Sequence, residues 1–229
     1  MKEWIIRNAS FKLQSGEKYV FVGGNGSGKS TCLQLLTGMF PANEGTISYI
    51  DDNNKAIDLD DWYKHLVMAT PYMELIEELT LREHIEFHRK FKSFKSSISS
   101  ADFEAFIQLP FATHKIVRHF SSGMKQRLKL GLALMSDVPV VILDEPTSNL
   151  DENGIQWYLE NVIKMTSKQL VLIGSNVERE YAFCENIISV SNFFISLALI
   201  SNFMYLFNFS KYCSLLSSIG VSLANSCSN

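Results

Sequence analysis

The sequence has 229 residues, of which 46% are hydrophobic and 20% charged, and these proportions exclude an intrinsically disordered chain. The net charge of -3 gives no basic field for holding nucleic acid, so we expect no nucleic-acid partner. The four cysteines lack metal-ligand spacing and no secretory signal opens the chain, which predicts a reducing, cytoplasmic setting.

The first predicted elements are a strand, a loop and a helix. Residues 17–22 form a β-rich run that ends at a glycine cluster, and a helical pattern follows over 30–36. A short strand is predicted over 46–50, a polar turn region over 51–61, and another strand over 65–69.

The middle of the chain changes character over residues 75–118, where helical periodicity predicts an insertion with helices at 81–88 and 102–108. Beyond it follow one predicted helix and two apolar strands, at 124–135, 138–143 and 170–174. Strands that alternate with helices are typical of the α/β class. We therefore expect a three-layer domain with a mostly parallel sheet.

Residues 191–229 differ from the rest in composition, because Lys211 is the only charged residue among them. The apolar run over 190–207 is nearly long enough to span a membrane, but Asn192 and Ser196 interrupt it early. Three interpretations stay open for this tail: a poorly ordered terminal extension, a stretch that is not native family sequence, such as the product of a frameshift, and a membrane anchor.

A phosphate-binding loop follows the first predicted strand. Residues 23–31 fit the pattern G-x-x-x-x-G-K-[ST] between a strand and a helix, where backbone N–H groups and the helix N-terminus attract phosphate oxygens. Lys29 is expected to reach the β- and γ-phosphates, and Ser30 to bind Mg²⁺. The residues predicted to bind ATP here are Gly23, Gly24, Asn25, Gly26, Ser27, Gly28, Lys29, Ser30 and Thr31.

Two adjacent carboxylates end the apolar strand at 138–143. Open α/β sheets bind ligands at this end of their strands. We expect Asp144 to hold the metal, and Glu145 to orient the attacking water or accept its proton as a catalytic residue.

The run F-S-S-G-M-K-Q-R at 120–127 resembles the signature of the ABC transporter family, usually LSGGQ, with Ser121 and Gly123 retained. Residues 146–151 resemble the D-loop of the same family. The resemblance covers about residues 1–190 and implies an ABC nucleotide-binding domain with a P-loop NTPase core and a helical subdomain inserted at about 74–123. It leaves the tail, 191–229, outside that core.

The resemblance also implies a mechanism. Two such domains pair head to tail, as a homo- or heterodimer, and each ATP lies between one phosphate loop and the Ser121 and Gly123 of the other domain. ATP with Mg²⁺ closes the pair, hydrolysis reopens it, and a transmembrane permease subunit uses the motion for transport. This places the chain in the cytoplasm, peripheral on the inner face of the cell membrane. The pattern is similar to small bacterial export-type and haem-exporter-like subunits, while substrate and direction stay unspecified.

Three positions depart from the family pattern. Tyr72 stands where the family has a metal-binding glutamine, and Glu74 is a candidate to replace it. Asn176 stands at the switch histidine; it is assigned to the catalytic set, because its amide can donate a hydrogen bond to phosphate although it cannot carry a proton. Trp4 is the nearest aromatic residue for stacking on adenine, and we expect it to serve in packing instead.

Alternatives to transport come from the same residues. One is a soluble ABC-type ATPase that remodels a protein assembly, and another is a weakly hydrolysing switch that dimerises on binding nucleotide. A zinc-protease motif at His84 and His88 is excluded because Ile85, not Glu, follows the first histidine, so a solvated helix face is predicted there.

Overall fold

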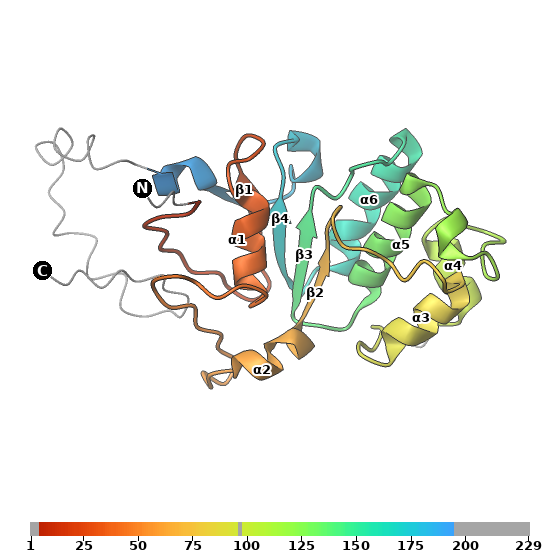
Figure 1. Cartoon of the computed structure of the whole chain (residues 1–229), viewed down its shortest axis with the longest axis horizontal. Coiled ribbons are helices and arrows are strands. Elements are labelled where there is room, and N and C mark those ends of the chain that lie inside the picture. The colour runs from red at the N-terminus through yellow and green to blue at the C-terminus, as the bar shows by residue number, and fades with distance from the viewer. Residues whose placement is uncertain (1–4, 96–97, 195–229) are drawn as a thin grey trace, which may run out of the picture.

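The computed structural model describes residues 5–95 and 98–194 of the chain. At its centre is one parallel sheet with strand order β2-β3-β4-β1-β5 (Figure 1). The strands are β1 (Lys18–Val22), β2 (Leu66–Ala69), β3 (Val140–Asp144), β4 (Leu170–Gly174) and β5 (Asn186–Ser189). Parallel neighbours require crossover connections, which place helices on the faces of the sheet. The predicted parallel sheet is confirmed.

Alternate strand residues face two separate hydrophobic cores, as the two-residue period of a strand requires. In β3, Val141 belongs to the core that contains α5 (Ser122–Met135) and α6 (Glu152–Met165), whereas Ile142 belongs to the core that contains α1 (Lys29–Leu36). Figure 1 shows α5 and α6 side by side, away from α1. The sheet is therefore the middle of three layers, as predicted.

The inserted segment contains α3 (Leu81–Arg89) and α4 (Ser100–Phe106). Both helices begin with a capping box; in α4 the Ser99 hydroxyl accepts from the N–H of Asp102 at 3.1 Å, and the Asp102 carboxylate accepts from the N–H of Ser99 at 3.0 Å. This cap explains why α4 begins earlier than the predicted 102–108.

Lys95 ties the inserted segment to the core. Its ammonium donates to the backbone carbonyl of Leu134 at 2.7 Å, to Gln169 Oε1 at 2.6 Å, and to the carbonyl of Met165. Leu134 and Met165 lie in the last turns of α5 and α6, where the helix dipoles favour a positive charge. Burial nevertheless lowers the pKa of Lys95 to about 8.

Two expectations about local structure are wrong. No strand forms over 46–50; Ile50 makes only an isolated antiparallel bridge to Ala56, because the Asp51 carboxylate accepts from two backbone N–H groups of the following turn and folds the chain back. The two histidines of α3 are not on a solvated face. His84 is 7% exposed and accepts from the N–H of Ile76, while His88 hydrogen-bonds to Ser136 at 2.8 Å.

Helix α6 and strand β5 were not predicted. Short helices complete the described chain: α2 (Leu59–Trp62) and single 3-10 turns η1 (Tyr63–His65), η2 (Val117–His119), η3 (Glu178–Glu180) and η4 (Val190–Phe194). Among the helices of the described residues, none is long and apolar enough to cross a membrane. Trp4 and most of the tail lie outside the described residues.

Candidate functional site

The loops that follow β1, β3 and β4 leave the sheet at the same edge because the strands are parallel. Two backbone hydrogen bonds join them there: the N–H of Glu145 donates to the carbonyl of Gly174 at 2.8 Å, and the N–H of Ser175 donates to the carbonyl of Phe21 at 3.2 Å. Residues as far apart in the sequence as Phe21 and Ser175 are thus held together at the carboxyl edge of the sheet.

The phosphate loop, residues 23–31, leads from the end of β1 into the first turn of α1. Gly28 caps this helix with φ 96°, a left-handed conformation that favours glycine. A Cβ on Gly23 would lie 2.5 Å from Ser27 Oγ, so a side chain there would collide with the loop. Lys29 is 5% exposed and its ammonium donates to the carbonyls of Gly23 at 2.8 Å and Gly24 at 3.1 Å. The loop thus holds its lysine against its own backbone.

Asp144 is a buried carboxylate without a hydrogen-bond partner for either oxygen. It is 1% exposed, and burial raises its pKa, as do the carboxylates of Glu145 and Glu180, while the neighbouring Ser30 hydroxyl and Lys29 ammonium lower it. A carboxylate in this state is costly unless something cationic joins it. Asp144 together with the Ser30 hydroxyl supplies the hard oxygen ligands that Mg²⁺ prefers, so the residues present fit that ion.

Glu145 has φ 44°, in the left-handed region that a non-glycine residue rarely adopts. Its backbone is fixed on both sides, by the bond to Gly174 and by the N–H of Ser148, which donates to the carbonyl of Glu145 at 3.0 Å. Strain of this kind persists only where surrounding structure enforces it, and it is concentrated at functional sites.

Asn176 lies beside the phosphate loop. Its side-chain amide donates to Asn25 Oδ1 at 3.3 Å, which joins the loop after β4 to the loop after β1. The amide group of Asn176 therefore contacts the phosphate loop directly.

Ser121 caps helix α5, and its hydroxyl accepts from the N–H of Met124 at 3.2 Å. Gly123 lies against the D-loop segment, since a Cβ there would be 2.9 Å from the carbonyl oxygen of Asn149. The Gln126 side chain also donates to the carbonyl of Pro146 at 2.9 Å. The signature and D-loop segments therefore form one packed unit.

The signature is not brought to the phosphate loop of the same chain. Helices α1 and α5 cover opposite faces of the sheet, and among the described residues no hydrogen bond or ion pair joins Ser121 or Gly123 to residues 23–31. The predicted ATP-binding residues thus form two separate groups in one chain.

The loop after β2 contains Tyr72, which is 75% exposed, and Glu74, which is also exposed. The ammonium of Lys129 on α5 fixes this loop by donating to the carbonyls of Thr70 at 3.1 Å and Pro71 at 3.0 Å. Neither exposed side chain is held near Asp144 by a hydrogen bond.

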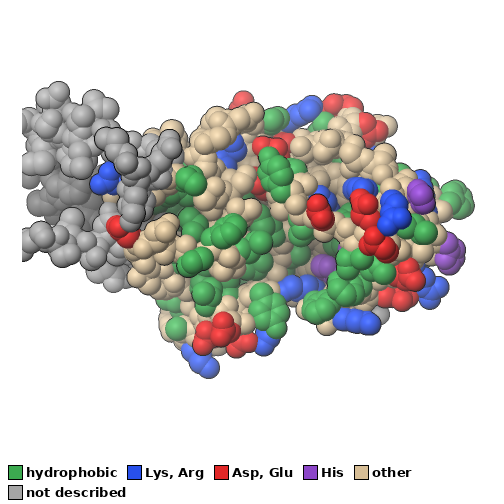
Figure 2. Space-filling view, in the orientation of Figure 1, with side chains coloured by type: hydrophobic (Ala, Val, Ile, Leu, Met, Phe, Trp, Pro, Cys, Tyr) green, Lys and Arg blue, Asp and Glu red, His purple; other side chains and the backbone are tan. Residues whose placement is uncertain are grey.

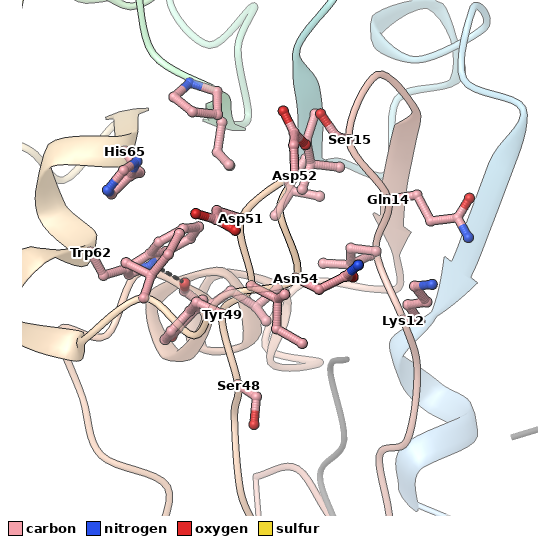
Figure 3. Close-up of a pocket in the computed structure, with 18 residues that line it drawn as sticks. Lys12, Gln14, Ser15, Ser48, Tyr49, Asp51, Asp52, Asn54, Trp62 and His65 are labelled. Atoms are coloured by element: carbon pink, nitrogen blue, oxygen red, sulfur yellow. Dashed lines mark hydrogen bonds between the residues drawn. The ribbon is translucent and has the colours of Figure 1, made fainter. Parts of the chain in front are cut away.

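A cavity of about 690 Å³ lies at the amino edge of the sheet, where the strands begin (Figure 3). Its lining includes Val140 and Leu170, the first residues of β3 and β4. Trp62, which also lines it, stacks on Tyr49 with centroids 4.1 Å apart and donates its indole N–H to the carbonyl of Leu36 at 3.0 Å. The cavity is therefore separate from the phosphate loop.

The fold and the carboxyl-edge site define a P-loop nucleotide-binding protein of the ABC type. A family model described as "ABC transporter" matches residues 6–148, more than half of the sequence, and the chain belongs to that family. Family membership confirms the predicted class, an ABC-type cassette.

Two curated relatives show the range of the family. The ribose import ATP-binding protein RbsA of Oceanobacillus iheyensis is 29% identical over 194 residues, which are 80% of this chain and 39% of that protein. The human phospholipid-transporting ATPase ABCA3 is 32% identical over 149 residues, 64% of this chain and 9% of that protein. The chain thus spans less than half the length of these relatives.

Solved structures support the fold. The cassette MJ0796, in a dimeric post-hydrolysis state bound to ADP and Pi, is similar with a TM-score of 0.69 and 24% identity, over 82% of this chain and 88% of that one. A putative ATP-binding protein from Pyrococcus furiosus has a TM-score of 0.65 and 17% identity, over 79% and 88%. The P-loop α/β core predicted from the sequence is confirmed.

Glu180 is the residue that the sequence did not indicate. It is 3% exposed and accepts from the N–H of Thr147 at 3.1 Å. Its neighbour Glu178 in the same 3-10 turn is exposed, and nothing in the sequence separates the two.

Proposed function

We propose that this cassette uses Glu145 and Asn176 to hydrolyse Mg²⁺-ATP and powers transport through a separate transmembrane permease subunit. The observation that carries the proposal is the unpaired, buried carboxylate of Asp144 beside Ser30 and Lys29. A charge without a partner at the carboxyl edge of a parallel sheet is an arrangement for binding a cation together with phosphate.

Binding starts from groups that the loop already holds. Ser30 and Asp144 would hold Mg²⁺, which neutralises phosphate charge when bound. Lys29 would exchange its two carbonyl partners for β- and γ-phosphate oxygens, while backbone N–H groups of residues 23–31 surround the phosphates.

Hydrolysis needs a base and a phosphate ligand. Glu145, held in its strained conformation, would orient the attacking water and accept its proton. Asn176 would donate its amide N–H to a γ-phosphate oxygen in place of its present partner Asn25. Because an amide does not titrate, proton transfer falls to Glu145.

The separation of the signature from the phosphate loop within one chain supports pairing with a second nucleotide-binding domain. The Ser121 hydroxyl and the N-terminal end of α5 at Gly123 would complete the site of the partner. The pair can be a homodimer or a heterodimer, with nucleotide favouring the closed arrangement.

A membrane partner is supported by an exposed aromatic surface, formed by Tyr63, Phe87 and Phe91. Their exposed fractions are 57%, 40% and 63%, and the Lys92 ammonium lies 5.6 Å from the Tyr63 ring centre. Figure 2 shows hydrophobic side chains over α2 and α3, with Lys, Arg, Asp and Glu side chains around them. We propose that this surface contacts the permease and that the cassette lies in the cytoplasm, peripheral on the inner face of the cell membrane. We also propose that the nucleotide-binding domain extends to about residue 190 and that its helical subdomain spans about residues 74–123.

The test is steady-state ATP hydrolysis with Mg²⁺ by the full chain and by Glu145→Gln, with nucleotide binding measured in both. Turnover that disappears in the variant while binding persists supports the assignment. Equal turnover in the two proteins overturns it. Co-purification with a multi-span membrane protein, reduced by Phe91→Ser, tests the partner and separates transport from the remodelling of a soluble assembly.

A second candidate is a nucleotide-dependent dimerisation switch with little hydrolysis. It is favoured by Asn176, which cannot carry a proton, and by the exposed Tyr72 at the position of the metal-binding glutamine. It predicts dimerisation on ATP without turnover, in the wild type as in Glu145→Gln.

A further inference from the structure

We infer that Glu180 is a positioning residue for ATP hydrolysis: its buried carboxylate ties the loop that carries Glu145 to the loop that carries Asn176. This inference rests on the proposed function, because it assigns to Glu180 the alignment of two residues that the proposed reaction uses.

The two oxygens of Glu180 serve different loops. Oε1 accepts from the backbone N–H of Thr147 at 3.1 Å and from the Thr147 hydroxyl. Oε2 accepts from the hydroxyl of Ser175. Thr147 follows Glu145 by two residues and Ser175 directly precedes Asn176, so a single carboxylate holds both loops next to the residues that act on ATP.

Glu180 is itself held firmly. Its N–H donates to the carbonyl of Val177 at 3.0 Å, and its carbonyl accepts from the hydroxyl of Tyr158, a fully buried side chain of α6, at 3.0 Å. The carboxylate therefore extends from a point anchored to the outer helical layer, and movement of α6 relative to the sheet would move both loops together.

A negatively charged side chain is unusual in a contact that only holds two loops together, as Glu180 does with Thr147 and Ser175. Glu180 is 3% exposed, and in the described part of the chain no ion pair involves it. A buried carboxylate without a cation costs free energy that a neutral side chain would avoid. What the carboxylate offers is acceptor capacity: its two oxygens receive all three donors at once, which a neutral amide cannot do.

The contact between Glu180 and Thr147 bears on the backbone conformation of Glu145. On one side its backbone is fixed by the bond to Gly174, and on the other side Thr147 is fixed by Glu180. The left-handed φ of 44° at Glu145 lies between these two anchors. Releasing one anchor lets this residue relax toward an ordinary conformation and moves its carboxylate away from the water it would activate.

The experiment compares Glu180→Ala and Glu180→Gln with Glu178→Gln, a matched control that changes an exposed carboxylate in the same 3-10 turn. We expect Glu180→Ala to lower kcat by about 10²-fold, the effect of a misplacement of about 1 Å, with the KM for ATP changed by less than about twofold. Glu180→Gln, which keeps one oxygen for Thr147 and can donate its amide to the Ser175 hydroxyl, should recover part of the loss. Glu178→Gln should match the wild type.

Hydrogen exchange measured on the same proteins gives a readout that does not depend on turnover. Faster exchange at residues 145–149 and 175–177 in Glu180→Ala, with residues 29–36 unchanged, supports the inference. The inference is overturned if the wild type hydrolyses ATP and Glu180→Ala has the same kcat. It is also overturned if the activity lost in Glu180→Ala is explained entirely by a smaller folded fraction or a raised KM. If the wild type shows no turnover, the proposed hydrolysis fails, and unchanged exchange in both loops then overturns the inference separately.

Discussion

Two charged side chains, one at each edge of the sheet, are treated in opposite ways. At the carboxyl edge, Asp144 is almost fully buried and neither of its oxygens has a partner. At the amino edge, where α5 and α6 end, the ammonium of Lys95 has three acceptors. A charge that the protein leaves unpaired is arranged for a ligand, whereas a charge that the protein satisfies stabilises the fold. The comparison predicts that removing each charge has opposite effects on stability.

The largest effect is expected for Asp144→Asn. Hydrolysis of Mg²⁺-ATP should fall by at least about 10²-fold, because an amide is a poor ligand for Mg²⁺. Without nucleotide, the free energy of unfolding should rise by about 1 kcal/mol, since a buried unpaired charge is removed. The measurements are steady-state hydrolysis and urea unfolding.

The stability gain of Asp144→Asn should depend on pH. Burial raises the pKa of Asp144, so the folded state binds its proton more tightly than the unfolded state, and wild-type stability falls as pH rises through that folded pKa. The gain should therefore be larger at neutral pH than at pH 4. The exposed Asp52→Asn is the control, and a destabilised Asp144→Asn with full activity would show that the charge is structural.

Lys95→Met should act in the opposite direction. The substitution removes the donor of three acceptors, which are the carbonyls of Leu134 and Met165 and Gln169 Oε1. The free energy of unfolding should fall by about 2–3 kcal/mol. Hydrolysis by the folded protein should be unchanged, because Lys95 is at the edge away from the phosphate loop. Lys168→Met, at an exposed position, is the matched control for urea unfolding. Equal stability of the two variants contradicts the assignment.

Asn176→Ala should have a smaller effect at the carboxyl edge. It removes one amide donor toward phosphate, which we expect to lower kcat by about tenfold, the value of a single hydrogen bond to a charged group. Asn176→His sharpens the test in single-turnover measurements. A rate that rises only where imidazole is protonated shows that a proton donor was missing, and an unchanged rate shows that positioning by the amide suffices.

The carboxyl edge was more predictable from sequence than the amino edge. The phosphate loop, Asp144 and Glu145 each follow a run of apolar residues, and parallel strands bring the ends of such runs to one edge. The sequence pattern therefore indicated which residues would meet, although it did not indicate that Glu145 has a left-handed backbone.

Long-range contacts explain what the sequence did not reveal. Lys95 and Gln169 are 74 residues apart, and Glu180 and Thr147 are 33 apart, so the burial of these polar residues depends on the packed fold. The short segment 46–50 has β-forming residues, but the turn at Asp51 folds it back before a ladder can form. Tertiary structure decides such cases where local preference is weak.

The smallest effect expected concerns the pH dependence of Lys95. Burial lowers its pKa from 10.5 to about 8, so between those values the folded state binds fewer protons than the unfolded state. Stability contributed by this residue therefore rises as pH increases through that window. Because Lys95 is only partly buried, solvent screening should keep the change below about 1.4 kcal/mol, the value of one full pKa unit. Urea unfolding of the wild type and Lys95→Met at pH 7.5 and pH 10 measures this pH dependence. A stability difference between the two proteins that grows with pH supports the assignment. A difference that shrinks with pH means that the contacts of the ammonium form stabilise the fold more than burial of the charge opposes it.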